Sequence, residues 1–259
     1  MNARRPPTRI RSVAKAIQIL LHVAEHPEGV SGRAIAEALG MPVATTHHLL
    51  ETLVDEGMLA KDSHRAYSLG SRVGALADAF QRRTAPPEFL MAPLRRLGDQ
   101  TGETAYLSGW QGDEAVVLAT VEGRHAVRVT SLHTGYAGHI NARASGKTLL
   151  AFARPGVFDR YLERHELDAL TPNTITDPAA LSAELERTRA RGYGHDEEEF
   201  TAGVSCVAAP VLDGGIAIAA YTVAAPTLRF EERREELIAT TCRIAAAAST
   251  AGATGGARA

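Results

Sequence analysis

The stretch "GMPVATTHHLLETLVDEGML", from Gly40 to Leu59, decides how the first part of the chain folds. Its apolar residues Leu49, Leu50, Leu53 and Val54 recur at helical spacing. Pro42 suits a first helical position, because its missing N–H would have no intrahelical partner there, and Gly57 ends the helix. The front of this helix carries "TTHH", a cluster of hydrogen-bonding side chains. Threonine is a mediocre helix former, so the cluster predicts a contact outside the helix.

The flanking segments predict a small helical unit with a hairpin. "SVAKAIQILLHVAEHPEG" predicts a first helix capped by Ser12, and "SGRAIAEALG" a second one capped by Ser31. After Gly57, "MLAKDSHRAYSLG" alternates as two strands around a tight turn at Asp62–Arg65. Three helices followed by a hairpin are the layout of a winged helix-turn-helix, which we place at residues 1–70. A three-helix packing unit of no special function has the same order of elements.

In the DNA-binding interpretation, the front of the third helix enters a major groove, where threonines and histidines contact base edges and phosphates. The basic residues of the first fifteen positions form an arm that follows phosphates or enters a minor groove. Alternatively, Thr45 bonds to a helix carbonyl and the histidines lie in solvent. The candidate DNA contacts are Arg9, Arg11, Arg33, Ala44, Thr45, Thr46, His47, His48, His64 and Arg65.

The remainder of the chain predicts a linker and an α/β domain. A helix from Ser71 that breaks at Pro86–Pro87 indicates a linker over residues 71–87. Residues 88–249 alternate between strand and helix patterns, including a clear helix between the cap Asp177 and the stop Gly192. The expected strands lie in 104–122, 125–135, 203–213 and 215–226, and the other expected helices in 93–102, 144–153, 155–164 and 230–249. The small-residue segment 250–259 predicts a disordered tail.

Composition sets limits on the class of protein. The 259 residues carry a formal net charge of −2, so total charge predicts no nucleic-acid partner. Two cysteines, Cys206 and Cys242, exclude a disulfide scaffold and favour a reducing cytoplasm. The basic N-terminus lacks the apolar core of a signal peptide, and no apolar run is long enough to span a membrane.

The motifs together resemble those of the IclR-type bacterial transcriptional regulators over essentially the full length. They are "SVAKAIQIL", the pattern P-x-x-T-x-H-x-L-L-x-T-L-x-x-E-G from Pro42, "YSLGSRV", "GKTLLAF", "TPNTITD", L-x-x-E-L-x-x-x-R-x-R-G-Y and "EEFTAGVSCVAAPV". The resemblance implies an α+β protein: a winged helix-turn-helix, a linker helix and a GAF-like α/β effector-binding domain. It also implies homodimers, or dimers of dimers, on palindromic double-stranded DNA, with small organic or aromatic acids as effectors.

The third helix departs from the family pattern. The family commonly has Lys-Ser after the proline and Arg after the histidine, whereas this chain has Val43, Ala44 and His48. Contacts from arginine or lysine to guanine are the commonest base-specific contacts in protein–DNA complexes. We therefore do not expect this helix to recognise an operator mainly through guanines. Phosphate affinity would then depend more on the N-terminal arm, Arg33, Lys61 and the hairpin.

The resemblance also carries over an effector pocket. Its residues would be Ala144, Ser145, Asp196, Val204, Cys206, Thr222 and Ala224. Apart from the resemblance, Tyr106, Trp110 and Tyr221 could supply aromatic walls, although an aromatic residue on a strand more often belongs to the core. "ASGKT" is not a phosphate loop, because Asn141 stands where glycine is required. A loop that leads into a helix N-terminus would instead attract a carboxylate.

Two other functions use the same residues. Cys206 with His139 or His195, oriented by Asp196, would make a nucleophile–base pair, but a cysteine in a buried strand usually is an inert hydrophobe. The same residues with His133 would offer metal ligands, but they lack tight ligand spacing. We therefore expect a cytoplasmic regulator of a catabolic operon, with no enzymatic activity, cofactor, metal or membrane partner. The alternative is a small-molecule sensor or enzyme with a vestigial DNA-binding head.

Overall fold

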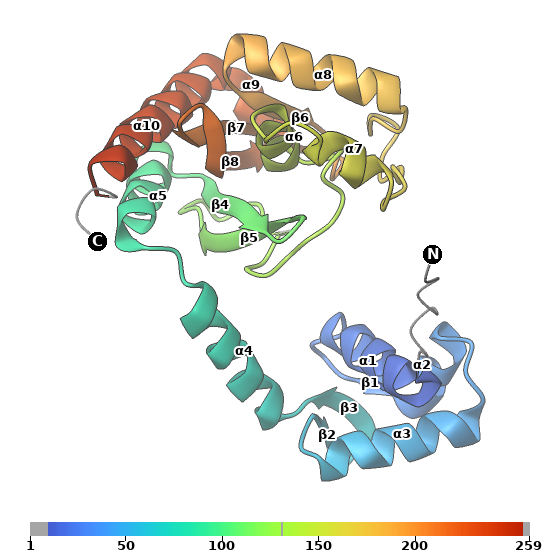
Figure 1. Ribbon diagram of the computed structural model, residues 1–259. Helices are drawn as coiled ribbons and strands as arrows, with labels where there is room; N and C mark the ends of the chain where they lie inside the picture. Colours follow the sequence, from blue (N-terminus) through green and yellow to red (C-terminus); the bar gives the residue numbers. More distant parts are fainter. Residues whose placement is uncertain (1–9, 131, 256–259) are drawn as a thin grey trace. The chain divides into compact units, whose positions relative to one another are not determined.

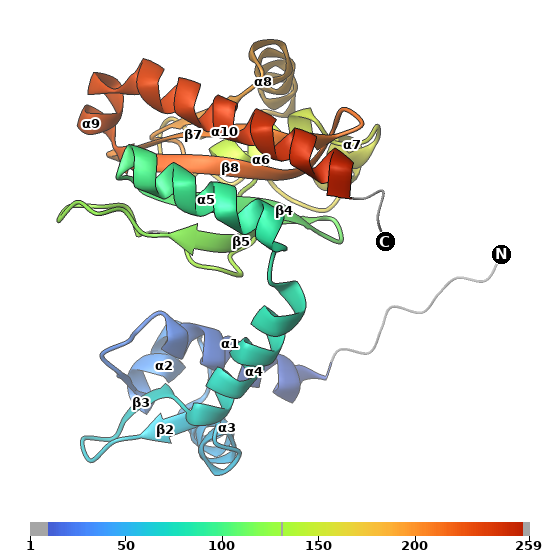
Figure 2. The ribbon, with the colours of Figure 1, turned by 90° about the vertical axis from the view of Figure 1, so that its left-hand side faces the viewer.

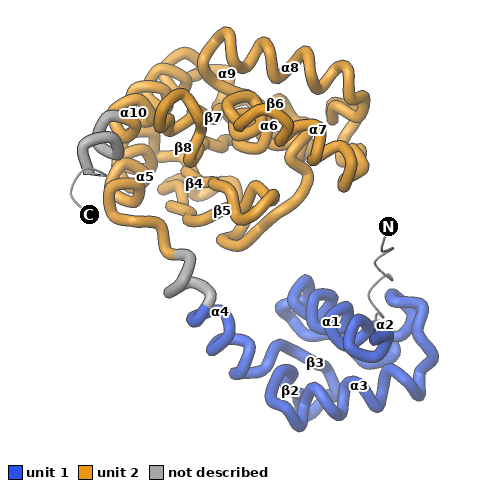
Figure 3. Tube along the Cα trace, viewed as in Figure 1, with its two compact units in different colours: residues 1–84 blue, residues 85–259 orange. Residues whose placement is uncertain are grey.

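A computed structural model describes residues 10–130 and 132–255. The chain divides into two compact units, Met1–Thr84 and Ala85–Ala259, which are described separately (Figure 3). Within the described ranges, no helix is long and apolar enough to cross a membrane.

Unit 1 contains helices and a small three-stranded antiparallel sheet (Figure 1). Its elements are α1 (Arg11–Ala24), β1 (Val30–Ser31), α2 (Gly32–Ala38), α3 (Val43–Asp55), β2 (Leu59–Lys61), β3 (Ala66–Leu69) and α4 (Ser71–Thr84). The sheet has the order β1-β3-β2, so the predicted hairpin is flanked by a short strand that precedes α2. Ile19, Ile35, Leu50 and Leu53 belong to the core that joins the first three helices.

The helix ends of unit 1 follow the sequence signals with two exceptions. Pro42, expected at the first helical position, is instead the N-cap residue of α3, and its carbonyl accepts the Thr46 N–H at 3.0 Å. Ser31 caps α2 as predicted, because its hydroxyl accepts the Ala34 N–H at 3.3 Å. The prediction that Ser12 caps α1 is wrong. Ile10 is the N-cap residue, and its carbonyl accepts the Ala14 N–H at 3.2 Å, so Ser12 lies inside the first turn.

Unit 2 is a three-layer α/β domain. Its strands are β4 (Thr104–Gln111), β5 (Glu114–Val121), β6 (Gly194–Glu197), β7 (Val204–Asp213) and β8 (Ile216–Pro226). They form an antiparallel sheet of order β5-β4-β8-β7-β6. Its helices are α5 (Glu88–Thr101), α6 (Ala144–Ala151), α7 (Val157–Leu162), α8 (Pro178–Arg191), α9 (Thr227–Glu232) and α10 (Arg234–Gly255). This arrangement is the expected GAF-like domain.

The two faces of the sheet are covered by different helices (Figure 2). Helices α5 and α10 pack side by side on one face, where Leu107 and Tyr221 join their core. Helices α6, α7 and α8 cover part of the other face. Because neighbouring residues of a strand point to opposite faces, Tyr106 and Thr222 lie on the α6 side of the sheet.

The structure of unit 2 differs from the sequence predictions at several points. Helix α5 begins at Glu88 rather than Pro93, and the single helix expected over 230–249 is divided into α9 and α10 at Arg233. No strand forms among the described residues of 125–135; the segment instead covers the sheet, held by the Thr104 hydroxyl bonded to the Val129 carbonyl. Strand β6 was not predicted, since its four residues are too few and too polar to show alternation. Helix α10 continues to Gly255, into the predicted tail, and residues 256–259 lie outside the described residues.

Candidate nucleic-acid interface and ligand cavity

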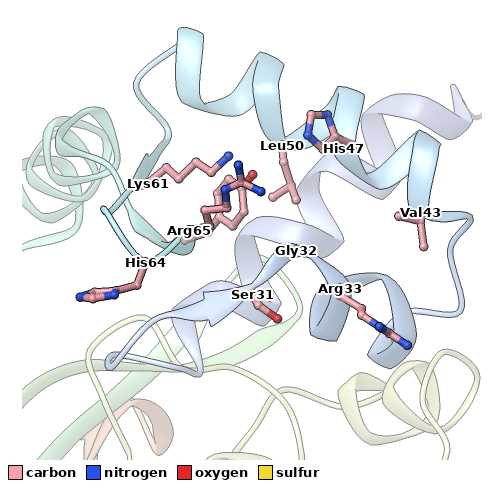
Figure 4. A pocket seen from close by; sticks show the side chains of 10 residues that line it. Ser31, Gly32, Arg33, Val43, His47, Leu50, Lys61, His64 and Arg65 are labelled. Carbon is pink, nitrogen blue, oxygen red and sulfur yellow. The ribbon is translucent and has the colours of Figure 1, made fainter.

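A groove of about 290 Å³ lies on unit 1 where α2, α3 and the hairpin meet (Figure 4). The start of α2 contributes Ser31, Gly32 and Arg33, α3 contributes Val43, His47 and Leu50, and the hairpin contributes Lys61, His64, Arg65 and Tyr67. None of these lining residues is acidic. The groove therefore combines polar and basic side chains from the elements that a helix-turn-helix protein presents to DNA.

The positive charges of the groove have no acidic partner within the part of the chain that the structure describes. In the ion pairs of the described residues, Arg33, Lys61 and Arg65 take no part. The Lys61 ammonium lies 5.2 Å from the centre of the Tyr67 ring, which holds it at the groove without removing its charge. Unit 1 contains 11 lysines and arginines against 8 aspartates and glutamates, although the whole chain is acidic. Such a surface favours a polyanion.

The front of α3 presents part of the predicted cluster. Val43, Ala44, His47 and His48 are exposed, and Thr45 is half-buried. Both histidines lie beside Glu51, at 3.3 Å for His47 and 3.9 Å for His48.

The prediction that Thr46 contacts bases is wrong. Its side chain is buried, and its hydroxyl donates to the Pro42 carbonyl at 3.2 Å. Thr46 lies four residues before Leu50 and seven before Leu53, so it continues the buried stripe of the helix. That spacing is visible in the sequence. The carbonyl-bonding arrangement that we considered for Thr45 belongs to its neighbour.

Side-chain hydrogen bonds fix the conformation of the hairpin turn. The Asp62 carboxylate accepts the backbone N–H groups of His64 and Ala66, at 2.9 and 2.8 Å. Arg65 has a φ of 62°, in the left-handed region, and its side chain is exposed with that of His64. Of the predicted arm, Arg11 is exposed at the start of α1 and does not line the groove, whereas Arg9 lies outside the described residues.

A second site is a cavity in unit 2, on the face of the sheet opposite α5 and α10. Its volume is only about 20 Å³, close to that of one water molecule. The cavity is lined by Tyr106, Val129, Leu132, Arg143, Ala144, Ser145, Asp196, Phe200, Val204, Cys206, Thr222 and Ala224. Seven of these were expected from the resemblance, and Tyr106 was expected as an aromatic wall. Strands β4, β6, β7 and β8 turn alternate residues toward the start of α6, which brings these side chains together.

Two expected aromatic residues lie elsewhere. Trp110 packs with the core beneath α6, α7 and α8, and Tyr221 faces α5, where its hydroxyl donates to the Leu90 carbonyl at 2.8 Å. The prediction that either is a cavity wall is wrong. The side chain of Tyr221 points to the other face of the sheet from its neighbour Thr222, and Trp110 lies near the end of β4. Phe200 lines the cavity instead, with Tyr136 against it edge-on.

Arg143 is the one charged residue among the four cavity residues that the sequence did not reveal, the others being Val129, Leu132 and Phe200. Its side chain is almost completely buried, and one terminal nitrogen donates to the Ala115 carbonyl at 2.6 Å. Its Nε and Nη1 have no hydrogen-bond partner among the described residues, and no carboxylate forms an ion pair with it there. Burial lowers the pKa of this guanidinium to about 10, so the group is still charged at neutral pH. An unpaired buried cation is costly unless an anion joins it.

Acidic and basic side chains also meet around Asp196, which lines the same cavity. The Asp196 carboxylate accepts the N–H groups of Glu199 and Phe200, at 2.7 and 3.3 Å. Burial nevertheless raises the pKa of Asp196 to about 7. Behind it, the buried ammonium of Lys147 is ion-paired with Glu199. Asp196 can therefore be either neutral or charged under physiological conditions.

The candidate nucleophile is not activated. Burial raises the pKa of the Cys206 thiol well above its usual value, and nearby Asp196 raises it further. His195 adjoins Asp196 on β6, so its side chain points away from the cavity, and its Nε2 lies 3.7 Å from a Glu184 carboxylate oxygen of α8. His139 is engaged elsewhere, because its Nδ1 shares a hydrogen bond of 2.8 Å with the Tyr136 hydroxyl. Within the described residues, His133, His139, His195, Asp196 and Cys206 do not form a cluster of metal donors.

Comparisons with known proteins agree for both units. The model of the IclR helix-turn-helix domain matches residues 12–63, and the bacterial transcriptional regulator IclR C-terminal model matches residues 88–250. The HTH-type transcriptional regulator BhcR of Paracoccus denitrificans is 38% identical over 227 residues, 87% of this chain and 81% of BhcR.

Solved structures show the same fold. The crystal structure of Thermotoga maritima IclR is 31% identical, with a TM-score of 0.70, over 93% of this chain and 98% of that one. An IclR homolog from Microbacterium hydrocarbonoxydans, solved with 4-hydroxybenzoate, has the same fold at 22% identity, with a TM-score of 0.68 over 92% and 98% of the two chains. Both family models match in the expected order, and together they span most of the sequence. The chain therefore belongs to the IclR family of bacterial transcriptional regulators.

Proposed function

We propose that this regulator controls a catabolic operon and responds to a small organic acid whose carboxylate pairs with Arg143. Residues 1–70 would bind the operator, residues 71–87 would link the domains, and residues 88–249 would bind the effector. The single observation that carries this proposal is the buried guanidinium of Arg143, which lines a cavity and has two donor nitrogens without partners among the described residues.

Other groups around the cavity support a carboxylate ligand. The Thr222 hydroxyl is buried there and also has no partner in the described part of the chain. Ala144 and Ser145 begin α6, whose first N–H groups and dipole favour an anion. The aromatic side chains of Tyr106 and Phe200 would contact an apolar or aromatic body. The 4-hydroxybenzoate bound by the Microbacterium relative is an acid of this chemical class.

Because the cavity is small, we expect an effector to displace the residues that cover it. A small organic acid cannot enter about 20 Å³ unless side chains move. Val129 and Leu132, from the segment between β5 and α6, cover the cavity without forming a helix or strand. An effector would thus favour a conformation in which this segment is displaced, and such differential binding is what a regulatory response requires.

The groove of unit 1 supports the DNA-binding part of the proposal. Arg33, Lys61 and Arg65 would neutralise phosphates, while Thr45, His47 and His48 would contact base edges. The absent arginine and lysine of α3 leave hydrogen bonds from threonine and histidine as the means of base recognition.

An exposed stripe on α1 supports the proposed homodimer, or dimer of dimers. Ile10, Val13, Ile17 and Leu21 follow helical spacing and are each more than half exposed. A contiguous apolar face of this kind marks an interaction site. A second copy is the simplest occupant, because two heads are needed to bind the two halves of a palindromic operator.

A gel shift tests the function. Full-length protein should retard DNA from upstream of its own gene more strongly than scrambled DNA, and an organic acid from a panel of aliphatic and aromatic carboxylates should change that affinity. The matching amides, which lack the negative charge, should have no effect. Failure to bind DNA under any condition would favour the alternative of a sensor with a vestigial DNA-binding head. An equal response to acids and amides would show that Arg143 does not recognise a carboxylate.

A further inference from the structure

A cluster of three metal-binding side chains lies at the end of α1. His22 is in the last turn of the helix, Glu25 is its C-cap residue and His26 follows. One donor atom from each lies within 4.8 Å of the other two. The imidazole rings are 4.5 Å apart between centres, and His22 Nδ1 is 4.0 Å from a Glu25 carboxylate oxygen.

The hydrogen bond of His26 prepares its ring for a metal. Its Nδ1 lies 2.8 Å from the His22 carbonyl oxygen. Because a carbonyl only accepts, Nδ1 carries the proton and donates it, so the neutral ring has its lone pair on Nε2. Histidine ligands in metal sites are generally oriented by such a bond from the second nitrogen.

We propose that His22, Glu25 and His26 bind a divalent transition-metal ion of the zinc class. Two imidazoles and one carboxylate are a ligand set found around zinc, with solvent at the fourth position. Imidazole ligands disfavour magnesium and calcium, which prefer oxygen. Donor atoms around a tetrahedral ion with bonds of about 2.0–2.2 Å lie roughly 3.4 Å apart, so these donors must approach one another by about 1 Å.

The positions of the ligands permit that approach. Glu25 is about three-quarters exposed, and both it and His26 lie beyond the last helical residue. His22 is mostly buried and fixes one side of the site. Rotation of the Glu25 side chain and a small shift of His26 would close the donor set, while the exposed carboxylate leaves the ion accessible.

An ion at this position would join α1 to the turn that follows it. The His26 carbonyl accepts the Gly29 N–H at 2.9 Å, and β1 begins at the next residue. Val23 and Val30, on the two sides of the turn, belong to the core of unit 1. An ion that binds only the folded state would therefore stabilise unit 1 against unfolding.

The sequence contains a signal for this site, although it lies outside the metal-ligand candidates of the second unit. His22 and His26 are four residues apart, with Glu25 between them, in "HVAEH". On a helix, residues four apart lie on one face. The chain also offers a matched control. His47 and His48 lie beside Glu51 on α3, and within residues 10–130 and 132–255 neither ring donates to a carbonyl oxygen.

The experiment titrates Zn²⁺ into full-length protein that carries no histidine tag, followed by calorimetry, with Co²⁺ absorption as a spectroscopic probe. We expect one tight ion per chain, loss of at least tenfold in affinity in both His22→Ala and His26→Gln, and a rise in the melting temperature of unit 1 with Zn²⁺. His47→Ala/His48→Ala, whose two histidines are assigned to DNA contacts, should retain the wild-type affinity for Zn²⁺.

Three results would overturn the proposal: no saturable binding, binding unchanged in the His22 and His26 variants, or equal competition by Mg²⁺. Circular dichroism in EDTA shows that each variant is folded before titration. His26→Gln retains a side chain of similar size at the end of the helix, so it guards against a loss of binding that comes only from misfolding of His22→Ala.

Discussion

The guanidinium carbon of Arg143 lies 5.3 Å from the centre of the Tyr136 ring, and this aromatic face takes the place of a carboxylate partner. A cation–π contact in a buried site compensates part of the cost of desolvation. The remaining nitrogens of Arg143 lie beside the cavity. The pair therefore holds a positive charge in position for an anion that arrives from solution.

Replacement of Arg143 by methionine should separate stability from ligand response. The neutral side chain has a similar length and removes a buried charge, so the unliganded protein should become more stable by an amount on the order of 1–3 kcal/mol, in line with the lowered pKa. The stabilisation by a carboxylate effector should disappear. Urea unfolding with and without the acid measures both effects. An unchanged effector response would show that the carboxylate binds elsewhere.

The titration of Asp196 should appear in the pH dependence of stability. Burial raises its pKa to about 7 in the folded protein, whereas an unfolded aspartate has a pKa near 3.9. Folding therefore favours the protonated form, and stability from this group is full below about pH 4 and falls as the pH rises to 7. Asp196→Asn retains an acceptor oxygen for the N–H groups of Glu199 and Phe200 and has no charge to desolvate.

The variant should thus be more stable than the wild type by roughly 2–4 kcal/mol at pH 8, and similar to it at pH 4.5. Urea unfolding at the two pH values makes the comparison. A constant difference between them would mean that Asp196 does not titrate in this range.

The two threonines of α3 should differ in their effect on DNA recognition. Thr45→Ala should reduce operator affinity by about 1–3 kcal/mol while random DNA binds nearly as before, because the lost contact is to a base. Thr46→Val retains the shape of the buried side chain and loses only the bond to the Pro42 carbonyl, so the ratio of specific to random binding should not change. Competition gel shifts with both variants measure this ratio. Equal loss on both DNAs for Thr45→Ala would exclude α3 as the reader of sequence.

The basic residues of the groove should contribute through phosphates. Arg33→Gln, Lys61→Gln and Arg65→Gln should each reduce the slope of log affinity against log salt by about 1, on any duplex. Arg72→Gln is the control, because Arg72 is ion-paired with Glu56 at 3.0 Å. Fluorescence anisotropy over a salt series measures the slope. If the control lowers it as much as the groove variants do, the effect is one of total charge.

The apolar stripe of α1 should control assembly. Ile17→Glu introduces a charge on a side chain that is 51% exposed, so the fold of the protomer should be little affected. We expect a shift to monomers in light scattering, with a loss of operator affinity. Val127→Glu places the same charge on an exposed residue of unit 2 and should leave assembly unchanged. A dimer that survives Ile17→Glu would assign the interface to another surface.

Local patterns determined much of the fold. Caps at Ser31 and Asp177 and the stop at Gly192 are confirmed, since each acts within one turn of its own helix. Strand pairs such as β4–β5 and β7–β8 follow from alternation and a tight turn. The resemblance to the family supplied most of the expected cavity residues. The alternation of side chains along the strands explains why those on the sheet lie together against the start of α6.

The tertiary structure decided which polar groups are buried and which have partners. Arg143 reads in the sequence as an ordinary basic residue before a helix, and only the packing of the segment 125–143 over the sheet makes it a buried cation. Val129 was expected in a strand and instead covers a cavity. Desolvation depends on all the atoms around a side chain, most of which come from distant parts of the chain, whereas helix periodicity and caps depend on neighbours within a few residues. That difference in range is why the elements could be predicted and the charge at the centre of the candidate effector site could not.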